Sequence, residues 1–222
     1  MPDTTQPRLV RTDPIGQRAP EVIRLLTEAY PGATVALNFS NPLEILVATI
    51  LSAQCTDVKV NEVTSTLFVK YRTPEDYLRV PEDELRADIK PTGFFNQKAA
   101  SIRAACQRII EVYDGRVPDT MEELITLRGV ARKTANIVLS NGFGKVEGIP
   151  VDTHVKRLAN RIGFSAHTDP DKIEQDLLRL VPREEWFPFS YVLIDHGRAV
   201  CHARKPACPA CPIEPLCPSS QA

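Results

Sequence analysis

The stretch Leu124-Ile-Thr-Leu-Arg-Gly-Val-Ala-Arg-Lys-Thr-Ala-Asn-Ile-Val-Leu139 decides the fold of this 222-residue chain. It predicts two short helices joined by a tight hairpin, the first opened by a capping box at Asp119 and Glu122. Gly129 lies where the turn needs a residue free to take positive φ, and the second helix begins at Arg132. The start of a helix leaves backbone N–H groups unpaired beside a partial positive charge, so this hairpin favours a phosphate.

Lys133 lies at the same helix end, and Asp152 follows in Val151-Asp-Thr-His154. An ammonium group is mildly disfavoured at a helix N-terminus, and a neutral lysine is a nucleophile whereas a protonated one is not. Most lysines are solvated surface charges, so the local pattern by itself favours a lysine that contacts phosphate. Asp152 by itself is equally the N-cap of a helix over 153–162, which ends at Gly163.

Four of the six cysteines form a second motif near the C-terminus, with gaps of six, two and five residues between Cys201, Cys208, Cys211 and Cys217. The N-terminus has no apolar signal region, so metal binding is favoured over disulfides. Zinc sites usually pair two short cysteine knuckles, whereas cubane iron–sulfur clusters also take four cysteines. Ligand chemistry alone leaves both open. The other two, Cys55 and Cys106, are expected to be buried thiols in helices.

The hairpin sequence Leu127-Arg-Gly-Val-Ala-Arg-Lys-Thr-Ala-Asn136, the Val-Asp-Thr-His segment and the cysteine spacing resemble the endonuclease III family of DNA glycosylases. The resemblance covers about residues 20–217. It implies that Lys133 attacks C1′ of a damaged nucleotide with help from Asp152, and that the four cysteines hold a [4Fe–4S] cluster. The family's hairpin usually reads Leu-Pro-Gly-Val-Gly, so Arg128 and Ala131 here depart from it.

Two further segments carry the resemblance to DNA-contacting parts of the family. Leu51-Ser-Ala-Gln54 is similar to a segment whose glutamine enters the gap left by an extruded base, although Gln54 is also an ordinary polar residue at a helix end. The segment 89–98 looks like the loop that wedges into the duplex, where core or turn packing is the ordinary alternative. The resemblance thus implies six DNA-contacting residues, namely Gln54, Thr92, Phe94, Gly129, Ala131 and Arg132.

The net charge of −1 gives no support to a nucleic-acid partner, but the distribution of charge does. Residues 128–161 hold seven lysines and arginines against two acidic residues. Solvated helix faces are the ordinary explanation, and the hairpin motif inside this segment favours a DNA-binding face instead. The longest apolar runs fall short of membrane-spanning length.

Strand-like alternation is absent from the sequence, so we predict an all-α fold. The resemblance implies two helical lobes with a DNA cleft between them, where Lys133 and Asp152 meet. We expect a flexible tail over 1–19 and a six-helix barrel-like domain with the helix-hairpin-helix over 36–145. The iron–sulfur cluster domain would then combine 20–35 with 146–222.

We therefore predict a base excision repair enzyme, a bifunctional DNA glycosylase and AP lyase that removes oxidised pyrimidines of the thymine glycol class. Its partner would be damaged double-stranded DNA, and it would be a monomer without membrane association, in the cytoplasm at a bacterial-type nucleoid. One alternative is a monofunctional mismatch or alkylation glycosylase of the same fold, which the presence of Lys133 disfavours. The other is a non-enzymatic DNA-binding protein with a four-cysteine metal site.

Overall fold

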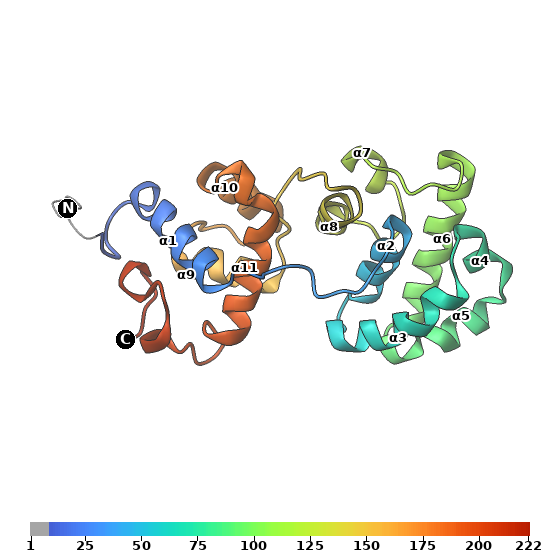
Figure 1. Ribbon diagram of the computed structural model, residues 1–222, viewed down its shortest axis with the longest axis horizontal. Helices are drawn as coiled ribbons and strands as arrows, with labels where there is room; N and C mark the ends of the chain where they lie inside the picture. Colours follow the sequence, from blue (N-terminus) through green and yellow to red (C-terminus); the bar gives the residue numbers. More distant parts are fainter. Residues whose placement is uncertain (1–8) are drawn as a thin grey trace. The chain divides into compact units, whose positions relative to one another are not determined.

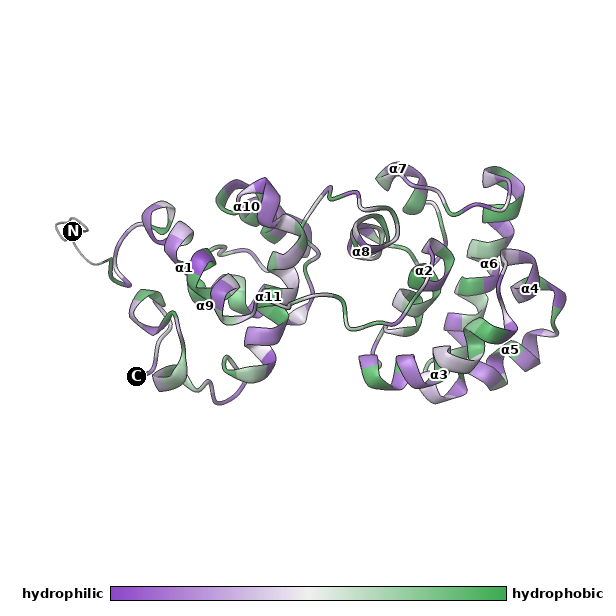
Figure 2. Ribbon diagram, viewed as in Figure 1, coloured by the Kyte–Doolittle hydropathy of each residue, from purple (hydrophilic) through white to green (hydrophobic). Residues whose placement is uncertain are grey.

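The computed structural model describes residues 9–222, and every regular element in that range is a helix (Figure 1). This confirms the all-α prediction. The described chain divides into two compact units, one formed by Val35–Glu147 and the other by the residues up to Thr34 together with Gly148–Ala222. Each unit has a hydrophobic core of its own. In Figure 2 most helices carry both hydrophilic and hydrophobic residues, as elements with one buried and one exposed face should.

The unit Val35–Glu147 is organised around the apolar helix α2. Its side chains are buried continuously from Ile45 to Leu51, because α3, α6 and α8 all pack against it. The shorter helices α4 and α5 cover α6. The elements of this unit are α2 (Pro42–Leu51), α3 (Asp57–Lys70), α4 (Pro74–Arg79), α5 (Glu82–Ile89), the 3₁₀ turn η1 (Lys90–Thr92), α6 (Phe95–Tyr113), α7 (Met121–Leu124) and α8 (Arg132–Phe143).

The second unit surrounds α11, which packs against α1 and α9, while α10 packs against α9. Beyond α11 the proline-rich cysteine segment contains only two 3₁₀ turns, because proline supplies no N–H for a regular helix. The elements are α1 (Ile15–Ala29), α9 (Thr153–Ile162), α10 (Pro170–Leu180), η2 (Arg183–Glu185), α11 (Trp186–Ala199), η3 (Cys208–Ala210) and η4 (Glu214–Leu216). No helix within residues 9–222 is long and apolar enough to cross a membrane.

The caps show where sequence patterns located helix ends correctly and where they did not. The Asn41 side chain accepts from the Glu44 amide at the start of α2, as a capping residue should. The capping box expected at Asp119 was wrong by one residue, because Thr120 caps α7. Asp119 instead accepts a hydrogen bond from the ammonium of Lys145.

The predicted N-terminal tail was wrong for its last part, because α1 begins at Ile15 and includes Pro20. Residues 1–8 of that tail lie outside the described residues. Arg18 is only 4% exposed. Its guanidinium donates to the carbonyl oxygens of Asp13, Ile162 and Leu216, so it ties α1 to the end of α9 and to the cysteine segment. Buried carbonyl oxygens need hydrogen-bond donors, and this need explains why the charged Arg18 is buried without a carboxylate partner.

Replacing Arg18 with methionine should destabilise the protein by roughly 2 to 3 kcal/mol, because three carbonyls lose a charged donor while the stem volume is kept. Chemical denaturation followed by circular dichroism measures the loss. Arg24 is the matched control on the same helix, since its ion pairs with Glu21 and Glu28 are exposed. Equal effects of Arg18→Met and Arg24→Met would contradict the structural role given to Arg18.

Candidate active site and cysteine centre

The hairpin between α7 and α8 depends on Gly129. Its φ is +85°, and a Cβ at this position would lie 2.9 Å from Cβ of Ser101 on α6. Two separate constraints therefore exclude other residues: the left-handed backbone and the close approach of α6. The Val130 amide closes the turn by donating to the carbonyl of Leu127 at 3.1 Å. The glycine that the sequence predicted for this turn has the predicted conformation.

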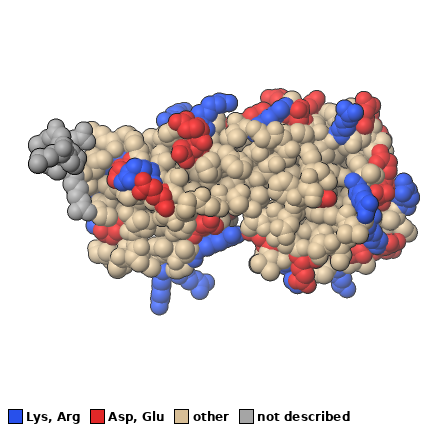
Figure 3. All heavy atoms as spheres, viewed as in Figure 1, with Lys and Arg blue, Asp and Glu red and all other residues tan. Residues whose placement is uncertain are grey.

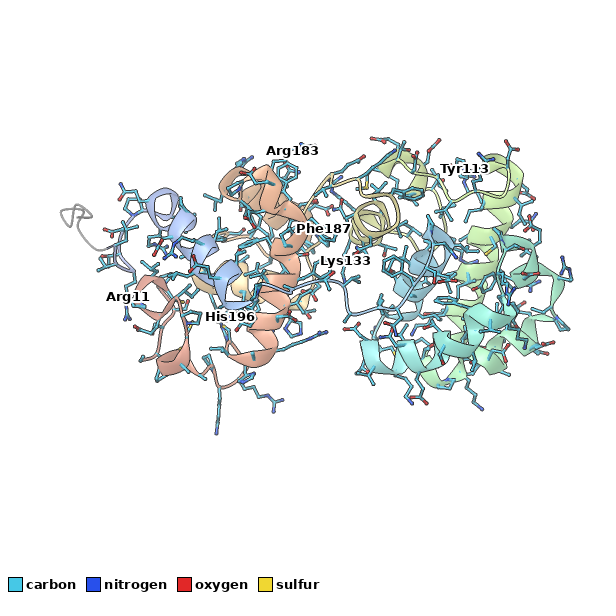
Figure 4. The ribbon with its side chains drawn as sticks, in the orientation of Figure 1. Arg11, Tyr113, Lys133, Arg183, Phe187 and His196 are labelled. Carbon is cyan, nitrogen blue, oxygen red and sulfur yellow. The ribbon has the colours of Figure 1, made fainter. Side chains whose placement is uncertain are left out.

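The start of α8 presents unused backbone donors next to Lys133. Ala131 is the N-cap residue and supplies no capping side chain. Within residues 9–222, the amides of Gly129 and Ala131 have no hydrogen-bond acceptor. Lys133 is exposed at the second position of the helix, on α8 in Figure 4, and Arg132 before it is half-buried. This arrangement can hold an anion at the backbone with an amine beside it.

Asp152 caps α9, as one interpretation of the sequence predicted. Its Oδ1 accepts from the Val155 amide at 2.8 Å, and the side chain is half-buried. Asp152 belongs to the unit that holds the cysteine segment, whereas Lys133 belongs to the unit Val35–Glu147.

The histidine of the Val-Asp-Thr-His motif is tied to the cysteine segment through an arginine. His154 Nδ1 lies 3.2 Å from Nη2 of Arg157. The same Nη2 donates to the carbonyl oxygens of Gly197 at 3.2 Å and Cys201 at 3.0 Å. A Cβ on Gly197 would lie 2.8 Å from Nδ1 of His154 and from Nη2 of Arg157, so a larger residue here would displace this pair.

Gln54 and Phe94 project from two turns with the same unusual backbone. Both are exposed, and both are non-glycine residues with positive φ, +52° for Gln54 and +48° for Phe94. The Phe94 side chain is 59% exposed, so its ring is accessible to a partner. Thr92 differs, since its side chain is 2% exposed and donates to the carbonyl of Ile89. This burial does not fit the DNA contact predicted for the Thr92 side chain.

All four C-terminal cysteines are free thiols and line one cavity. Side chains of other segments reach two of the sulfurs: Nη1 of Arg161 donates to Sγ of Cys201 at 3.3 Å, and Nε2 of His196 lies 3.5 Å from Sγ of Cys211. Burial raises the pKa of the Cys211 thiol to about 11. No three His, Cys, Asp or Glu side chains of the described chain are grouped closely enough to hold one metal ion.

The two remaining cysteines differ from each other. Cys106 is 1% exposed, as predicted, and burial raises the pKa of its thiol to about 12. Cys55 is only partly buried, and it packs against the core of its unit from the turn beside Gln54, outside any helix.

The basic segment 128–161 is less available to a ligand than its composition suggests. Arg161 donates to the carbonyls of His202 and Ala203, and Arg157 is bound as described above. Lys145 pairs with Asp119, and Lys156 donates to a backbone carbonyl on the α10 side. Figure 3 likewise shows basic and acidic side chains interspersed on the face in view. Counting charges in the sequence therefore overstated the basic face, because side-chain donors of these four residues serve the protein itself.

Sequence analysis missed several buried polar groups, among them Lys98 and His196. Lys98 is 4% exposed and His196, labelled on α11 in Figure 4, is 1% exposed. The burial of Lys98 could have been predicted from the sequence, because Lys98 falls on the apolar stripe of α6 with Ile102, Ala105 and Ile109. The burial of His196 could not, since its partners Tyr30 and Cys211 are distant in the sequence.

Comparison with known proteins gives consistent results. The model of the HhH-GPD superfamily base excision DNA repair protein matches residues 47–183. The chain is 52% identical over 206 residues to endonuclease III of Synechocystis sp., covering 93% of this chain and 94% of that protein. Its identity to endonuclease III of Escherichia coli is 42% over 197 residues, covering 89% and 93%. A solved structure of a trapped endonuclease III–DNA covalent intermediate matches with a TM-score of 0.89 and 43% identity, covering 93% and 97%.

The hairpin before α8 and the helices around it define a helix-hairpin-helix protein of base excision DNA repair. The identity over most of the chain is more specific, and the chain belongs to the endonuclease III family. It is accordingly a bifunctional enzyme, a DNA N-glycosylase and AP lyase for oxidised pyrimidines.

Replacing Gly129 with alanine should weaken DNA binding and destabilise the protein by more than the roughly 1 kcal/mol expected of strained backbone alone. The added methyl group collides with Ser101, which displaces the hairpin amides. Gly144→Ala is the matched control, because φ there is +66° at the other end of α8 and nothing lies within 4 Å of the new atom. Thermal unfolding measures the change in stability of each variant, and a duplex-binding assay measures its change in affinity for DNA. Similar losses in the two variants would mean that contact with α6 does not position the hairpin.

Proposed function

We propose that Lys133 is the nucleophile of both reactions. Its lone pair forms a bond to C1′, and the bond from C1′ to the base breaks, so that the base leaves with the electron pair and takes up a proton. Opening of the sugar ring then gives an imine between Lys133 and C1′. Loss of a proton from C2′ expels the 3′ phosphate by β-elimination and cuts the strand. The exposed amine at the start of α8, beside unused backbone donors, is the observation that carries this proposal.

The same donors give the phosphate backbone a place to bind. The amides of Gly129 and Ala131 would hold a phosphate next to the reacting nucleotide, and Arg132 would add a charge contact. Such contacts position a duplex without reading its sequence, which suits an enzyme that searches for damage anywhere in DNA. Arg128 and Ala131 leave both backbone donors in place, so we assign them an effect on affinity and none on chemistry.

Asp152 would stabilise the positive charge that develops on the sugar and help to deprotonate the amine. A carboxylate can do this while also capping α9, because the cap uses Oδ1 alone. The same residue, Asp152, would therefore cap α9 and take part in the reaction.

Gln54 and Phe94 would hold the duplex open while the damaged nucleotide is extruded. A base inside the stack is out of reach, so it must leave the helix at a cost of a few kcal/mol. An inserted aromatic ring and a polar side chain in the gap offset part of that cost. The exposure of both side chains supports these roles. Thymine glycol in double-stranded DNA is the substrate we propose.

The cysteine cavity fits a [4Fe–4S] cluster. Four thiols line one space, and the side chains of Arg161 and His196 reach two of the sulfurs, as is usual for iron–sulfur sites. When bound, the cluster would cross-link a segment that has little regular structure of its own. The chain would use this rigid loop, with exposed Arg204 and Lys205, to contact DNA phosphates.

The remaining proposals concern the state in which the enzyme works. The unit Val35–Glu147 would serve as the helix-hairpin-helix domain, and the other unit as the cluster domain. We propose a monomer that acts in the cytoplasm, at a bacterial-type nucleoid.

Lys133→Ala should abolish the covalent adduct that borohydride forms on a duplex with one thymine glycol, because no imine can form without the amine. Lys145→Ala is the control, since it removes an exposed lysine from just beyond the other end of α8. Gel electrophoresis of the trapped complex measures the adduct. An adduct that persists in Lys133→Ala would assign the nucleophile elsewhere, and base release without an adduct in the wild type would indicate a monofunctional enzyme.

Asp152→Asn should lower the trapping rate by about 100-fold through loss of charge stabilisation. It should leave the melting temperature unchanged, because asparagine is an equally good N-cap. Asp152→Ala should lose the same activity and, in addition, about 1 kcal/mol of stability. Wild-type activity in Asp152→Asn would show that only the cap matters.

The purified protein should be brown and contain about four iron and four sulfide ions per chain, the content of a [4Fe–4S] cluster. Cys208→Ser should lose the colour and lower the melting temperature, because the cluster would no longer link η3 to the rest of the loop. Metal analysis that finds one zinc ion and no sulfide would contradict the cluster.

A further inference from the structure

Lys98 is a buried ammonium whose hydrogen-bond partners are backbone carbonyls. Its Nζ donates to the carbonyl oxygens of Leu51 and Thr92, both at 2.8 Å. Burying an ammonium group is costly unless its donors are used, and burial lowers the pKa of this lysine. A methionine would fill the same volume without that cost. The hydrogen bonds are therefore what the lysine contributes at this position.

The two carbonyls mark the bases of the two turns that carry Gln54 and Phe94. Leu51 is the last residue of α2, three residues before Gln54. Thr92 ends η1, two residues before Phe94. The backbone of Lys98 adds a third link, because its amide donates to the carbonyl of Phe94 at 3.1 Å. One residue of α6 thus bonds to the bases of both turns.

Both turns contain backbone that needs support. Gln54 and Phe94 adopt the left-handed conformation that side-chain-bearing residues rarely take. Such conformations persist where the surrounding structure enforces them, and they gather at functional sites. Each turn also projects its residue outwards, so few contacts of the side chain itself hold it in place. The distance between the two turns can therefore be fixed only by contacts at their buried ends.

We infer that Lys98 is a positioning residue that holds Gln54 and Phe94 at the separation needed for both to enter an opened duplex together. The inference rests on the DNA roles proposed for these two side chains. An inserted pair offsets the cost of extrusion only if both members reach the gap at once, and a misplacement of about 1 Å at a reacting centre can cost about 100-fold in rate. Lys98 touches no substrate in this account and acts through the two turns.

The test is a mutant cycle on the rate of borohydride trapping with a thymine glycol duplex. Four proteins are compared: wild type, Lys98→Met, the double variant Gln54→Ala with Phe94→Ala, and the combination of all three changes. In the wild-type background K98M should lower the rate by about 10- to 100-fold. In the Q54A/F94A background it should lower the rate by about twofold or less, because the residues through which it acts are already gone.

Stability controls separate positioning from folding. Ile102→Val removes a methyl group from the same buried face of α6, one turn beyond Lys98, and should leave trapping unchanged at temperatures where the variant is folded. If K98M is unfolded at the assay temperature, the whole cycle is run at a lower temperature at which thermal unfolding shows all four proteins to be folded.

Each outcome bears on a different claim. An equal loss from K98M in both backgrounds, or no loss in either, would overturn the positioning role. A Q54A/F94A variant with full activity would instead overturn the proposed roles of those side chains in the duplex.

Discussion

The close packing of α8 on α2 is the contact on which the unit Val35–Glu147 depends. At Gly142, α8 lies so close to α2 that a Cβ on this glycine would be 3.3 Å from Cα of Pro42 and 3.3 Å from the side chain of Ile45. Helices that approach at a glycine have little freedom to slide or rotate against one another. Lys133 lies at the start of α8, and Gln54 follows the end of α2. A single packing contact therefore orients the elements that carry the proposed nucleophile and a side chain proposed to enter the duplex.

The cysteine segment depends on a different kind of interaction, namely charged donors that satisfy backbone carbonyls. Three arginines perform this function: Arg18 from α1, and Arg157 and Arg161 from α9. The segment forms only short 3₁₀ turns, so most of its carbonyls lack the partners that a helix would provide. Guanidinium groups suit this task because each offers several donors in a rigid plane and stays charged when buried. The segment keeps its shape through the side chains of other elements.

In the unit Val35–Glu147, Lys98 likewise satisfies backbone carbonyls with a charged donor. A charged donor inside the core replaces regular secondary structure at a place where two chain turns must lie side by side. Apolar contacts have no preferred direction, whereas a hydrogen bond requires its donor to point at one particular acceptor. The two bonds from Lys98 therefore link the carbonyls of Leu51 and Thr92 specifically.

The sequence by itself determined the helical fold, the hairpin at Gly129 and the cap at Asp152, since each depends on neighbours a few residues apart, and its motifs identified the family. Only the tertiary structure showed that Arg18 and Lys98 are buried donors, that Thr92 faces inwards, and that Arg157 and Arg161 serve the cysteine segment. The partners of these side chains are carbonyl oxygens, most of them distant in the chain. Every residue has a carbonyl, so no pattern of residue types can reveal which one a buried charge will meet.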